Sequence, residues 1–331
     1  MRGKILTFLR ERKDYVSGQE LCDFFGVSRT AVWKAIHKLQ EEGYQIEAVT
    51  NRGYHLVEQE QAEFFGATEI ESRLHTKWLG TPLYFYPETD STNVRAKLAA
   101  EEGEQSGALF VADKQTAGRG RRGRSWESPA GGNMYFTLLL RPKIAPDRAS
   151  MLTLVAAMAL TKAIKDFLPK EEKPKVGIKW PNDVVLGGRK VSGILTEMST
   201  EPEHIHYVVI GIGVNTGRQE WPEELADKAT SLEETLGHKV NRSVLLARFL
   251  EELEKAYETF LGTEDMTFLR EEYNELSVNR EKMVRVLDPK GEYEGLALGI
   301  NNRGELLVET QGEVREVYAG EVSVRGMLGY I

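Results

Sequence analysis

The segment from Lys114 to Arg124 has the residue types needed to bind an anion. It holds one lysine and four arginines with no acidic residue, and Gly118, Gly120 and Gly123 are interspersed among them. Guanidinium groups bind phosphate or carboxylate through paired hydrogen bonds, and glycines allow the backbone to approach a ligand closely. The segment is therefore predicted to be a phosphate- or carboxylate-binding loop.

The same glycines satisfy the spacing G-x-G-x-x-G of a dinucleotide-binding fold, but their surroundings do not. That fold needs a helix directly after the glycines, so that the helix dipole meets the pyrophosphate. Here the following residues include Pro129, Gly131 and Gly132, and the sequence then becomes strand-like. We therefore reject a dinucleotide fold, while a surface loop that binds nucleic acid remains the alternative.

Two further polar motifs accompany the loop. Thr89–Asn93 reads T-D-S-T-N, and Lys179–Asp183 reads K-W-P-N-D, with its lysine at the end of a strand-like run. Each motif alone has an ordinary structural explanation, because Ser91 or Thr92 could simply cap a helix and Lys179 could be a surface residue. Their occurrence beside an arginine-rich loop favours a shared ligand site.

These motifs lie in a region where strand-like and helical runs alternate. Such alternation predicts an α/β domain with a mixed sheet. The expected strands are 83–86, 108–112, 134–140, 176–179, 183–186, 191–197 and 207–214, and the expected helices are 93–102, 151–167, 242–261 and 267–275.

The first sixty residues predict a helix-turn-helix followed by a hairpin. Ser17 and Glu20 form a capping box, Ser28 can cap the next helix, and Asn51 and Gly53 suit a tight hairpin turn. This order is typical of a winged helix, whose second helix in the turn enters the DNA major groove. The predicted DNA-binding residues are Ser28, Arg29, Thr30, Trp33, Lys34 and Arg52.

A small protein-interaction module is the alternative for this region. Nine basic and nine acidic residues in 1–61 leave it formally neutral, whereas a freestanding DNA-binding domain is usually basic. Dimerisation on two-fold related half-sites would compensate for weak binding by a single module.

Short β-rich pieces from Val278 to Met327, separated by Gly- and Asn-containing turns, predict a small barrel. The chain is thus expected to be an α+β multidomain protein with three parts. They are a winged helix-turn-helix at 1–62, an α/β catalytic domain with a mixed sheet at 63–276, and a small SH3-like β-barrel at 277–331.

Composition narrows the class of protein. A length of 331 residues fits more than one domain, and a net charge of −8 argues against coating nucleic acid or membrane with the whole surface. One cysteine, Cys22, excludes an internal disulfide and a cysteine-based zinc site. The apolar run 151–160 is too short to cross a bilayer, and the N-terminus has no secretion signal, so we expect a cytoplasmic protein.

Taken together, Ser91–Asn93, the run Gly118–Gly123 and Lys179–Asp183 resemble the signatures of the biotin protein ligase family, in the same order. The resemblance extends over almost the whole chain. A winged helix at the N-terminus is similar to the two-function members, which attach biotin and also repress biotin genes. The C-terminal small barrel is shared as well.

The resemblance implies an activity, its substrates and its partners. Biotin and ATP, with Mg²⁺, would give biotinyl-5′-adenylate, and a lysine of the biotin carboxyl carrier protein would then accept the biotinyl group. The adenylate-bound protein would form a homodimer on operator DNA with two-fold half-sites. Both chemical steps move negative charge, so catalysis should depend on positioning and electrostatic stabilisation.

The family signatures also imply roles for individual residues, with Lys179 and Arg121 in catalysis. The implied biotin-binding residues are Ser91, Thr92, Asn93, Gln115, Arg119, Gly120, Arg121, Lys179 and Gly193, and Gly213 would help to leave room for the ring. The implied ATP- or adenylate-binding residues are Gly118, Arg119, Arg121, Arg122, Trp126, Lys179, Asn182, Asn215 and Trp221. No metal ligand can be identified from the sequence.

Two other functions stay open. A transcription factor that senses biotin without catalysis would share the winged helix and the pocket, but Lys179 and the arginines favour an enzyme. A lipoate-type ligase would share the architecture, but the arginine-rich loop and the winged helix argue against it.

Overall fold

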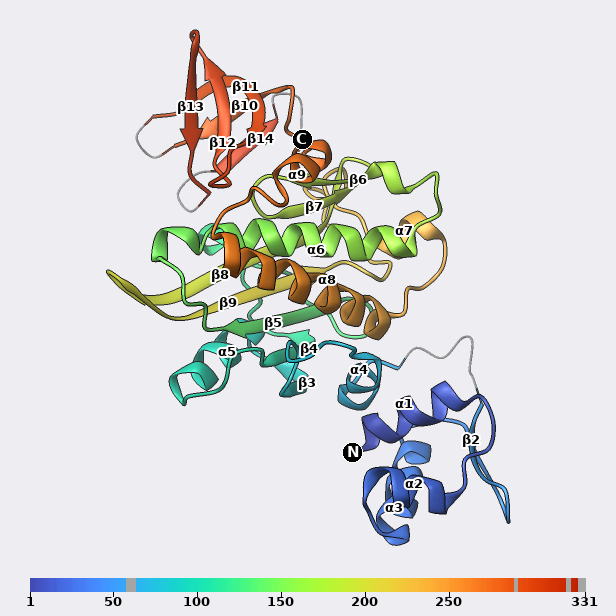
Figure 1. Ribbon diagram of the computed structural model, residues 1–331. Helices are drawn as coiled ribbons and strands as arrows, with labels where there is room; N and C mark the ends of the chain where they lie inside the picture. Colours follow the sequence, from blue (N-terminus) through green and yellow to red (C-terminus); the bar gives the residue numbers. More distant parts are fainter. Residues whose placement is uncertain (58–63, 289–290, 320–322, 327–331) are drawn as a thin grey trace. The chain divides into compact units, whose positions relative to one another are not determined.

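The computed structural model describes residues 1–57, 64–288, 291–319 and 323–326 (Figure 1). The chain divides into two compact units. The N-terminal unit contains Met1–His75 together with Asn241–Ala247, and the second unit contains the other described residues. Each unit is described by itself below.

The N-terminal unit contains the predicted helix-turn-helix and hairpin. Its elements are α1 (Arg2–Arg12), α2 (Gly18–Phe25), α3 (Arg29–Glu41), β1 (Ile46–Val49), β2 (Gly53–Leu56) and α4 (Ala67–Arg73). Ser17 and Ser28 cap α2 and α3, since their side chains accept hydrogen bonds from Glu20 N and Ala31 N. Asn51 and Gly53 have positive φ in the hairpin, as predicted.

Apolar side chains from all three N-terminal helices and the hairpin form the core of this unit. Leu6, Leu21, Ile36 and Leu39 are among its fully buried members. Helix α4 contacts α1 through a buried carboxylate, because Arg10, Arg73 and Tyr44 all hydrogen-bond to Glu69. Helix α4 therefore packs on the winged helix.

A seven-stranded mixed sheet organises the second unit, with the order β3-β4-β5-β9-β8-β7-β6. Its strands are β3 (Leu83–Thr89), β4 (Leu109–Gln115), β5 (Met134–Leu140), β6 (Val176–Lys179), β7 (Asp183–Leu186), β8 (Arg189–Glu201) and β9 (His204–Val214). Strands β3 and β4 are parallel, and the other neighbours are antiparallel. The predicted mixed sheet is confirmed, and β5, β6 and β7 have the expected bounds.

Helices cover both faces of this sheet. On β5, Thr137 contacts α5 (Thr92–Glu101), while the neighbouring Phe136 contacts Phe249 of α8 (Arg242–Thr263). Since adjacent strand residues point to opposite faces, α5 and α8 lie on opposite sides. The apolar helix α6 (Met151–Phe167) lies beside α8 in Figure 1 and contacts β6, β7 and β8.

Several short helices complete this unit. They are the 3₁₀ turns η1 (Arg121–Gly123), η2 (Pro146–Arg148) and η3 (Lys173–Lys175), and the α-helices α7 (Leu232–Leu236) and α9 (Arg270–Leu276). Among the described residues no helix is both long and apolar enough to span a membrane.

The C-terminal strands form a separate five-stranded antiparallel sheet with the order β13-β12-β11-β10-β14. They are β10 (Lys282–Leu287), β11 (Tyr293–Ile300), β12 (Leu306–Thr310), β13 (Glu313–Val317) and β14 (Ser323–Gly326). The β-rich domain is therefore present. The described parts of β13 and β14, at the two ends of the sheet, do not pair with each other, so the predicted closed SH3-like barrel is not confirmed.

Candidate functional site

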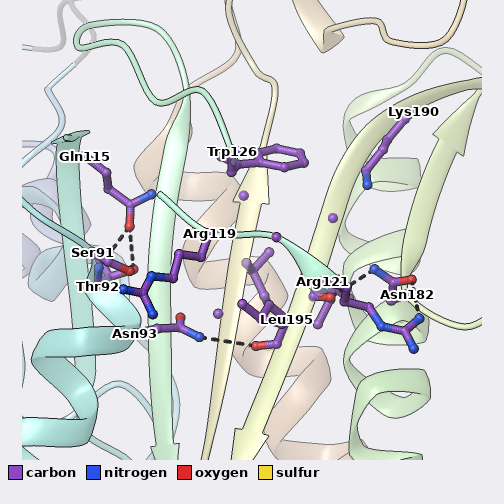
Figure 2. A pocket seen from close by; sticks show the side chains of 16 residues that line it. Ser91, Thr92, Asn93, Gln115, Arg119, Arg121, Trp126, Asn182, Lys190 and Leu195 are labelled. Atoms are coloured by element: carbon purple, nitrogen blue, oxygen red, sulfur yellow. Dashed lines mark hydrogen bonds between the residues drawn. The ribbon is translucent and has the colours of Figure 1, made fainter. Parts of the chain in front are cut away.

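A pocket at one end of the central sheet brings together most of the predicted site residues. The carboxyl ends of β3 and β4, the Gly-Arg loop and the strands β8 and β9 contribute to it (Figure 2). Its lining contains Ser91, Thr92, Asn93, Gln115, Arg119, Gly120, Arg121, Trp126, Asn182, Lys190, Gly193, Ile194, Leu195, Gly211, Ile212 and Gly213. Ten of these residues are predicted biotin- or nucleotide-binding residues.

Hydroxyl and amide groups gather at one side of the pocket. The side-chain carbonyl of Gln115 accepts hydrogen bonds from Thr92 N at 2.9 Å and Thr92 Oγ1 at 3.1 Å. Ser91 stands at the N-cap position of α5, but its side chain makes no capping hydrogen bond. Capping therefore does not explain this serine, and its hydroxyl lies in the pocket lining instead.

Asn93 differs from these neighbours because the protein itself occupies its amide. The Asn93 amide donates to Glu197 at 2.8 Å, and its oxygen accepts from Thr137 at 2.6 Å. A Cβ on Gly211 would lie 1.9 Å from Asn93 Oδ1, so only glycine fits against this side chain. Asn93 thus shapes the pocket from a fixed position.

An indole ring of the pocket lining lies over two glycines that pair with each other on β8 and β9. A Cβ on Gly213 would lie 2.5 Å from the Trp126 ring, and one on Gly193 would lie 2.9 Å from it. The ring nitrogen of Trp126 is buried and has no hydrogen-bond partner in the structure. Both glycines are therefore required by the close approach of an aromatic ring, and the unpaired nitrogen makes this arrangement costly.

Two cations, Lys190 and Arg121, lie at the other side of the pocket, whereas Arg119 lies on the side of Thr92 (Figure 2). Lys190 Nζ lies 5.2 Å from the centre of the Trp126 ring and 2.6 Å from Asp183. Arg121 donates to Asn182 Oδ1 at 3.1 Å and to the carbonyl oxygen of Ala319 at 2.6 Å. Burial lowers the pKa of Arg121, although Asp183 acts in the opposite direction.

Lys179 is not part of the pocket lining. It ends β6, is 7% exposed, and pairs in register with Asp183. Burial lowers its pKa to about 8, Asp183 opposes this shift, and Lys190, Arg325 and Arg124 reinforce it. A lysine with this pKa responds strongly to any anion that approaches.

Four other predicted nucleotide-binding residues also lie outside the lining. Gly118 packs against the backbone of Trp126, because a Cβ on Gly118 would lie 2.4 Å from the Trp126 carbonyl oxygen. Arg122 donates to Leu287 O at 3.5 Å. Asn215 donates to Thr230 O at 3.3 Å, and Trp221 donates to Glu234 at 2.8 Å. The structure therefore does not bring these four residues into the pocket itself.

Lys190 is the functional candidate that the sequence analysis missed. Strict alternation along β8 would place Lys190 and Gly193 on opposite faces. A shift in register between Val184 and Val185 of β7 interrupts that alternation, and Lys190 Cε lies 3.0 Å from where a Cβ of Gly193 would be. Such a bulge redirects one side chain and leaves no clear mark in a single sequence.

The predicted DNA-binding residues all lie on the exposed surface of the N-terminal unit. Ser28, Arg29, Thr30, Trp33 and Lys34 are exposed on α3 or its cap, and Arg52 is exposed at the hairpin turn. Trp33 stacks on His37 with the ring centres 5.3 Å apart, and Arg52 lies 4.2 Å from the centre of the Tyr15 ring. The helix and the hairpin each present cationic side chains.

Comparisons with known proteins agree with this architecture. Residues 85–215 match the Biotin/lipoate A/B protein ligase family, residues 2–55 match an HTH domain, and residues 281–325 match the Biotin protein ligase C terminal domain. The biotin protein ligase from Aquifex aeolicus in complex with biotin and ATP has 31% identity and a TM-score of 0.64. That match covers 74% of this chain and 99% of the other.

Two curated relatives match along nearly the whole chain. The Bifunctional ligase/repressor BirA of Bacillus subtilis is 37% identical over 97% of both chains. The protein of the same name from Escherichia coli is 32% identical over 97% of this chain and 96% of its own. The match runs through the helix-turn-helix, the pocket and the C-terminal sheet, and the chain belongs to the biotin protein ligase family, alongside its bifunctional ligase/repressors.

Proposed function

We propose that this protein activates biotin with ATP and transfers it to a lysine of the biotin carboxyl carrier protein. The observation that carries this proposal is one pocket with hydroxyl and amide groups at one side and the cations Arg121 and Lys190 at the other. Arg119 lies on the side of the hydroxyl groups (Figure 2). Biotin has the matching polarity, with a ureido group at one end and a carboxylate at the other. The names of the relatives support the same activity.

The ureido group would bind at the side formed by Ser91, Thr92, Gln115 and the backbone of Arg119 and Gly120. A cyclic urea needs hydrogen-bond acceptors for its N–H groups and donors for its oxygen, and hydroxyl and amide side chains provide both. Gly193 and Gly213 would act on the biotin ring through Trp126, because this indole fills the space that a Cβ would take at either glycine. Trp126 would then be the apolar neighbour of the biotin ring.

The carboxylate would point toward Lys190 and Arg121. In the first step a carboxylate oxygen forms a bond to the α-phosphorus of ATP, and pyrophosphate leaves. In the second step the acceptor amine forms an amide bond to the biotinyl carbon, AMP leaves, and the amine loses a proton. In both steps negative charge develops near these cations. Fixed positive groups stabilise such charge in the transition state.

Lys179 would act on the phosphate side of the same reaction, beside Asp183 and Lys190. Burial and neighbouring cations already disfavour its charged form, so a bound phosphate would restore the charge. Residues of the Gly-Arg loop, the turn before β7 and the segment after β9 would complete the nucleotide site. They are Gly118, Arg122, Trp126, Asn182, Asn215 and Trp221.

Mg²⁺ would accompany the nucleotide. Within the described ranges there is no group of three or more His, Cys, Asp or Glu side chains that could hold a metal ion. We expect the ion to be held mainly by phosphate oxygens and water, which Mg²⁺ prefers. The protein would contribute little direct coordination.

The test of the enzymatic proposal is biotin-dependent exchange between ATP and labelled pyrophosphate, followed by labelling of a carrier-protein acceptor. We expect both, and expect biotin to be accepted in preference to lipoate. Ligand-dependent DNA binding without exchange would instead indicate a biotin sensor without catalysis, and preference for lipoate would indicate a lipoate-type ligase.

We further propose that the adenylate-bound protein dimerises and represses by binding operator DNA through α3 and the hairpin. Strand β7 pairs with β8 only from Arg189 to Gly193, and Ile194 N donates to Asn182 O. Within the described chain Leu195–Glu201 therefore pair on one side alone, with β9. Such an edge can pair with a second copy. Two copies would place two winged helices on two-fold half-sites.

This second function is tested by operator binding with and without biotin and ATP, combined with sedimentation to measure the oligomeric state. We expect ligand to promote both the dimer and DNA binding. Because linkage is reciprocal, operator DNA should also tighten adenylate retention. The three-part division at 1–62, 63–276 and 277–331 remains the proposed domain organisation.

A further inference from the structure

A chain of hydrogen bonds leads from the pocket to Glu197 on β8. Thr137 Oγ1 lies within hydrogen-bonding distance of Thr92 Oγ1, at 2.8 Å, and of Asn93 Oδ1, at 2.6 Å. The Asn93 amide then donates to Glu197 Oε2 at 2.8 Å. Lys97 donates to the other oxygen of this carboxylate, also at 2.8 Å. The chain thus connects a residue of the pocket lining to an ion pair behind it.

The members of this chain are held rigidly. Thr137 is fully buried, and Thr92 and Asn93 are 3% and 5% exposed. Gly211 packs directly against Asn93, because a Cβ there would lie 1.9 Å from Asn93 Oδ1. Water therefore cannot readily replace Thr92, Asn93 or Thr137, and each of these polar groups depends on its protein neighbour.

Glu197 determines which way the Asn93 amide faces. An ionised carboxylate only accepts hydrogen bonds, and so does the carbonyl oxygen of Leu195, which lies 3.5 Å from the same Asn93 nitrogen. Both acceptors require the NH₂ group on their side, so Asn93 must turn its oxygen toward Thr137. Burial alone would raise the pKa of Glu197, but hydrogen bonds from Asn93 and Lys97 outweigh it and lower the pKa.

The orientation of Asn93 then decides where the hydroxyl proton of Thr137 goes. Thr137 has one hydroxyl proton and two neighbouring acceptors, Asn93 Oδ1 and Thr92 Oγ1. With the Asn93 oxygen facing it, Thr137 can donate to Asn93, and the lone pairs of Thr92 Oγ1 stay available. With the amide reversed, Asn93 would donate to Thr137, whose proton would turn to Thr92 Oγ1 and occupy one of its two lone pairs.

We propose that Glu197 is a positioning residue that keeps the Thr92 hydroxyl oxygen as an acceptor for a ligand N–H. Glu197 thereby selects ligands with an N–H donor at this end, such as a cyclic urea or amide. The inference rests on the proposed function, in which that ligand is biotin. It adds a residue outside the pocket lining to the determinants of ligand choice.

The test is calorimetric measurement of biotin affinity in the full-length wild type and in matched variants. Glu197→Gln keeps the shape but leaves only the 3.5 Å contact with Leu195 O to fix the orientation of the Asn93 amide, and we expect affinity to fall about tenfold. The control Lys97→Met removes the partner cation while leaving the carboxylate, and affinity should stay within about twofold of wild type. Thermal unfolding of each variant reports whether it is folded.

The second measurement is the affinity for a biotin analogue methylated at the ureido nitrogen that faces Thr92. A merely structural role of Glu197 would not change how much this methyl group weakens binding. The methyl group should weaken binding to wild type about tenfold and to Glu197→Gln much less. If Glu197→Gln does not fold, Glu197→Asp serves as the second variant, because its shorter side chain withdraws the carboxylate from Asn93. Its affinity should fall several-fold.

The outcomes separate the inference from the proposed function. Weaker binding in Glu197→Gln with an unaffected Lys97→Met supports the inference. Wild-type affinity in both Glu197 variants, or equal loss in Glu197→Gln and Lys97→Met, overturns it while leaving the function in place. Failure of the wild type to bind biotin overturns the proposed function itself.

Discussion

Glu69 in the N-terminal unit and Asp183 beside the pocket are both carboxylates surrounded by cations, but their surroundings differ. Glu69 is 2% exposed, and its two oxygens accept hydrogen bonds from Arg10, Arg73 and the Tyr44 hydroxyl. Asp183 contacts Lys190 at 2.6 Å and also acts on Lys179 and Arg121. One cluster is closed around its acid, and the other faces a pocket.

The comparison shows two uses of buried charge. In the Glu69 cluster the carboxylate raises the pKa of Arg10, while burial, the larger effect, lowers it. Around Lys179, burial and three neighbouring cations together bring the pKa down to about 8. The first arrangement is complete without a ligand, whereas the second becomes more favourable when an anion arrives. A cluster that stabilises the fold thus has its charges compensated within the protein, whereas a cluster that binds an anion keeps an excess of positive charge.

The largest effect is expected when the closed cluster loses its acid. Glu69→Gln would leave Arg10 and Arg73 with a neutral partner in a buried site, and removing one member of a buried ion pair typically costs about 3–5 kcal/mol. Chemical denaturation followed by circular dichroism should therefore show loss of the N-terminal unit at a lower denaturant concentration. An unchanged midpoint would contradict a role for this cluster in stability.

The corresponding change in the pocket should affect chemistry instead. Lys190→Met removes a cation that faces the ligand, and loss of one such group typically lowers the rate by about 10²–10³-fold. Biotin-dependent pyrophosphate exchange measures the loss, while thermal stability should change little. Lys175→Met, which removes a surface lysine paired with Glu172, is the matched control. A normal rate in Lys190→Met would exclude it from the reaction.

Lys190 also shows where sequence-based prediction stops. Elements with strong periodicity were predictable, and α6 and β5 have the predicted bounds, because apolar spacing determines which face is buried. The pocket side chains carried by short motifs, such as Thr92, Gln115 and Arg121, were predictable too. The position of Lys190 depends on a register shift between two strands, and that shift arises from tertiary pairing.

The C-terminal region illustrates a second limit. Short strands and their turns were visible in the sequence, and the five strands are present. Whether the end strands pair depends on contacts between residues far apart in the chain, which strand-like spacing does not determine. Spacing therefore predicts the strands but not their closure into a barrel, and closure is not seen in the described residues.

A pH experiment sharpens the comparison at Lys179. Its folded pKa of about 8 is below the unfolded value of 10.5, so between these values the unfolded state binds more protons. Stability should therefore rise with pH from about 8 to 10.5, by up to ~3 kcal/mol relative to Lys179→Met. Urea unfolding of both proteins across this range measures the difference. Parallel curves would contradict the lowered pKa.

The same lysine predicts proton uptake when an anion binds. A bound phosphate would raise the pKa of Lys179, so at pH 8 to 9 ligand binding should take up a fraction of a proton. Calorimetry with biotin and ATP in buffers of different ionisation enthalpy measures this fraction. Lys179→Met should lose most of the uptake, and equal uptake in both proteins would assign the proton to another group.

The smallest effect is expected on the exposed face of α3. Lys34 is exposed and makes no ion pair among the described residues, so it is available to contact a DNA phosphate. Lys34→Ala should weaken binding to specific and unrelated DNA alike, and the slope of log K against log salt should fall by about 1. Binding isotherms at several salt concentrations give the slope.

Lys38 on the same helix is the matched control. Its ammonium already pairs with Glu41 at 2.8 Å, so its charge is partly compensated before DNA arrives. Lys38→Ala should therefore change the salt slope less than Lys34→Ala. Equal changes would mean that α3 attracts DNA through its total charge. A larger change for Lys34 would mean that a cation with no acidic partner among the described residues contributes more to DNA binding than one that is already paired.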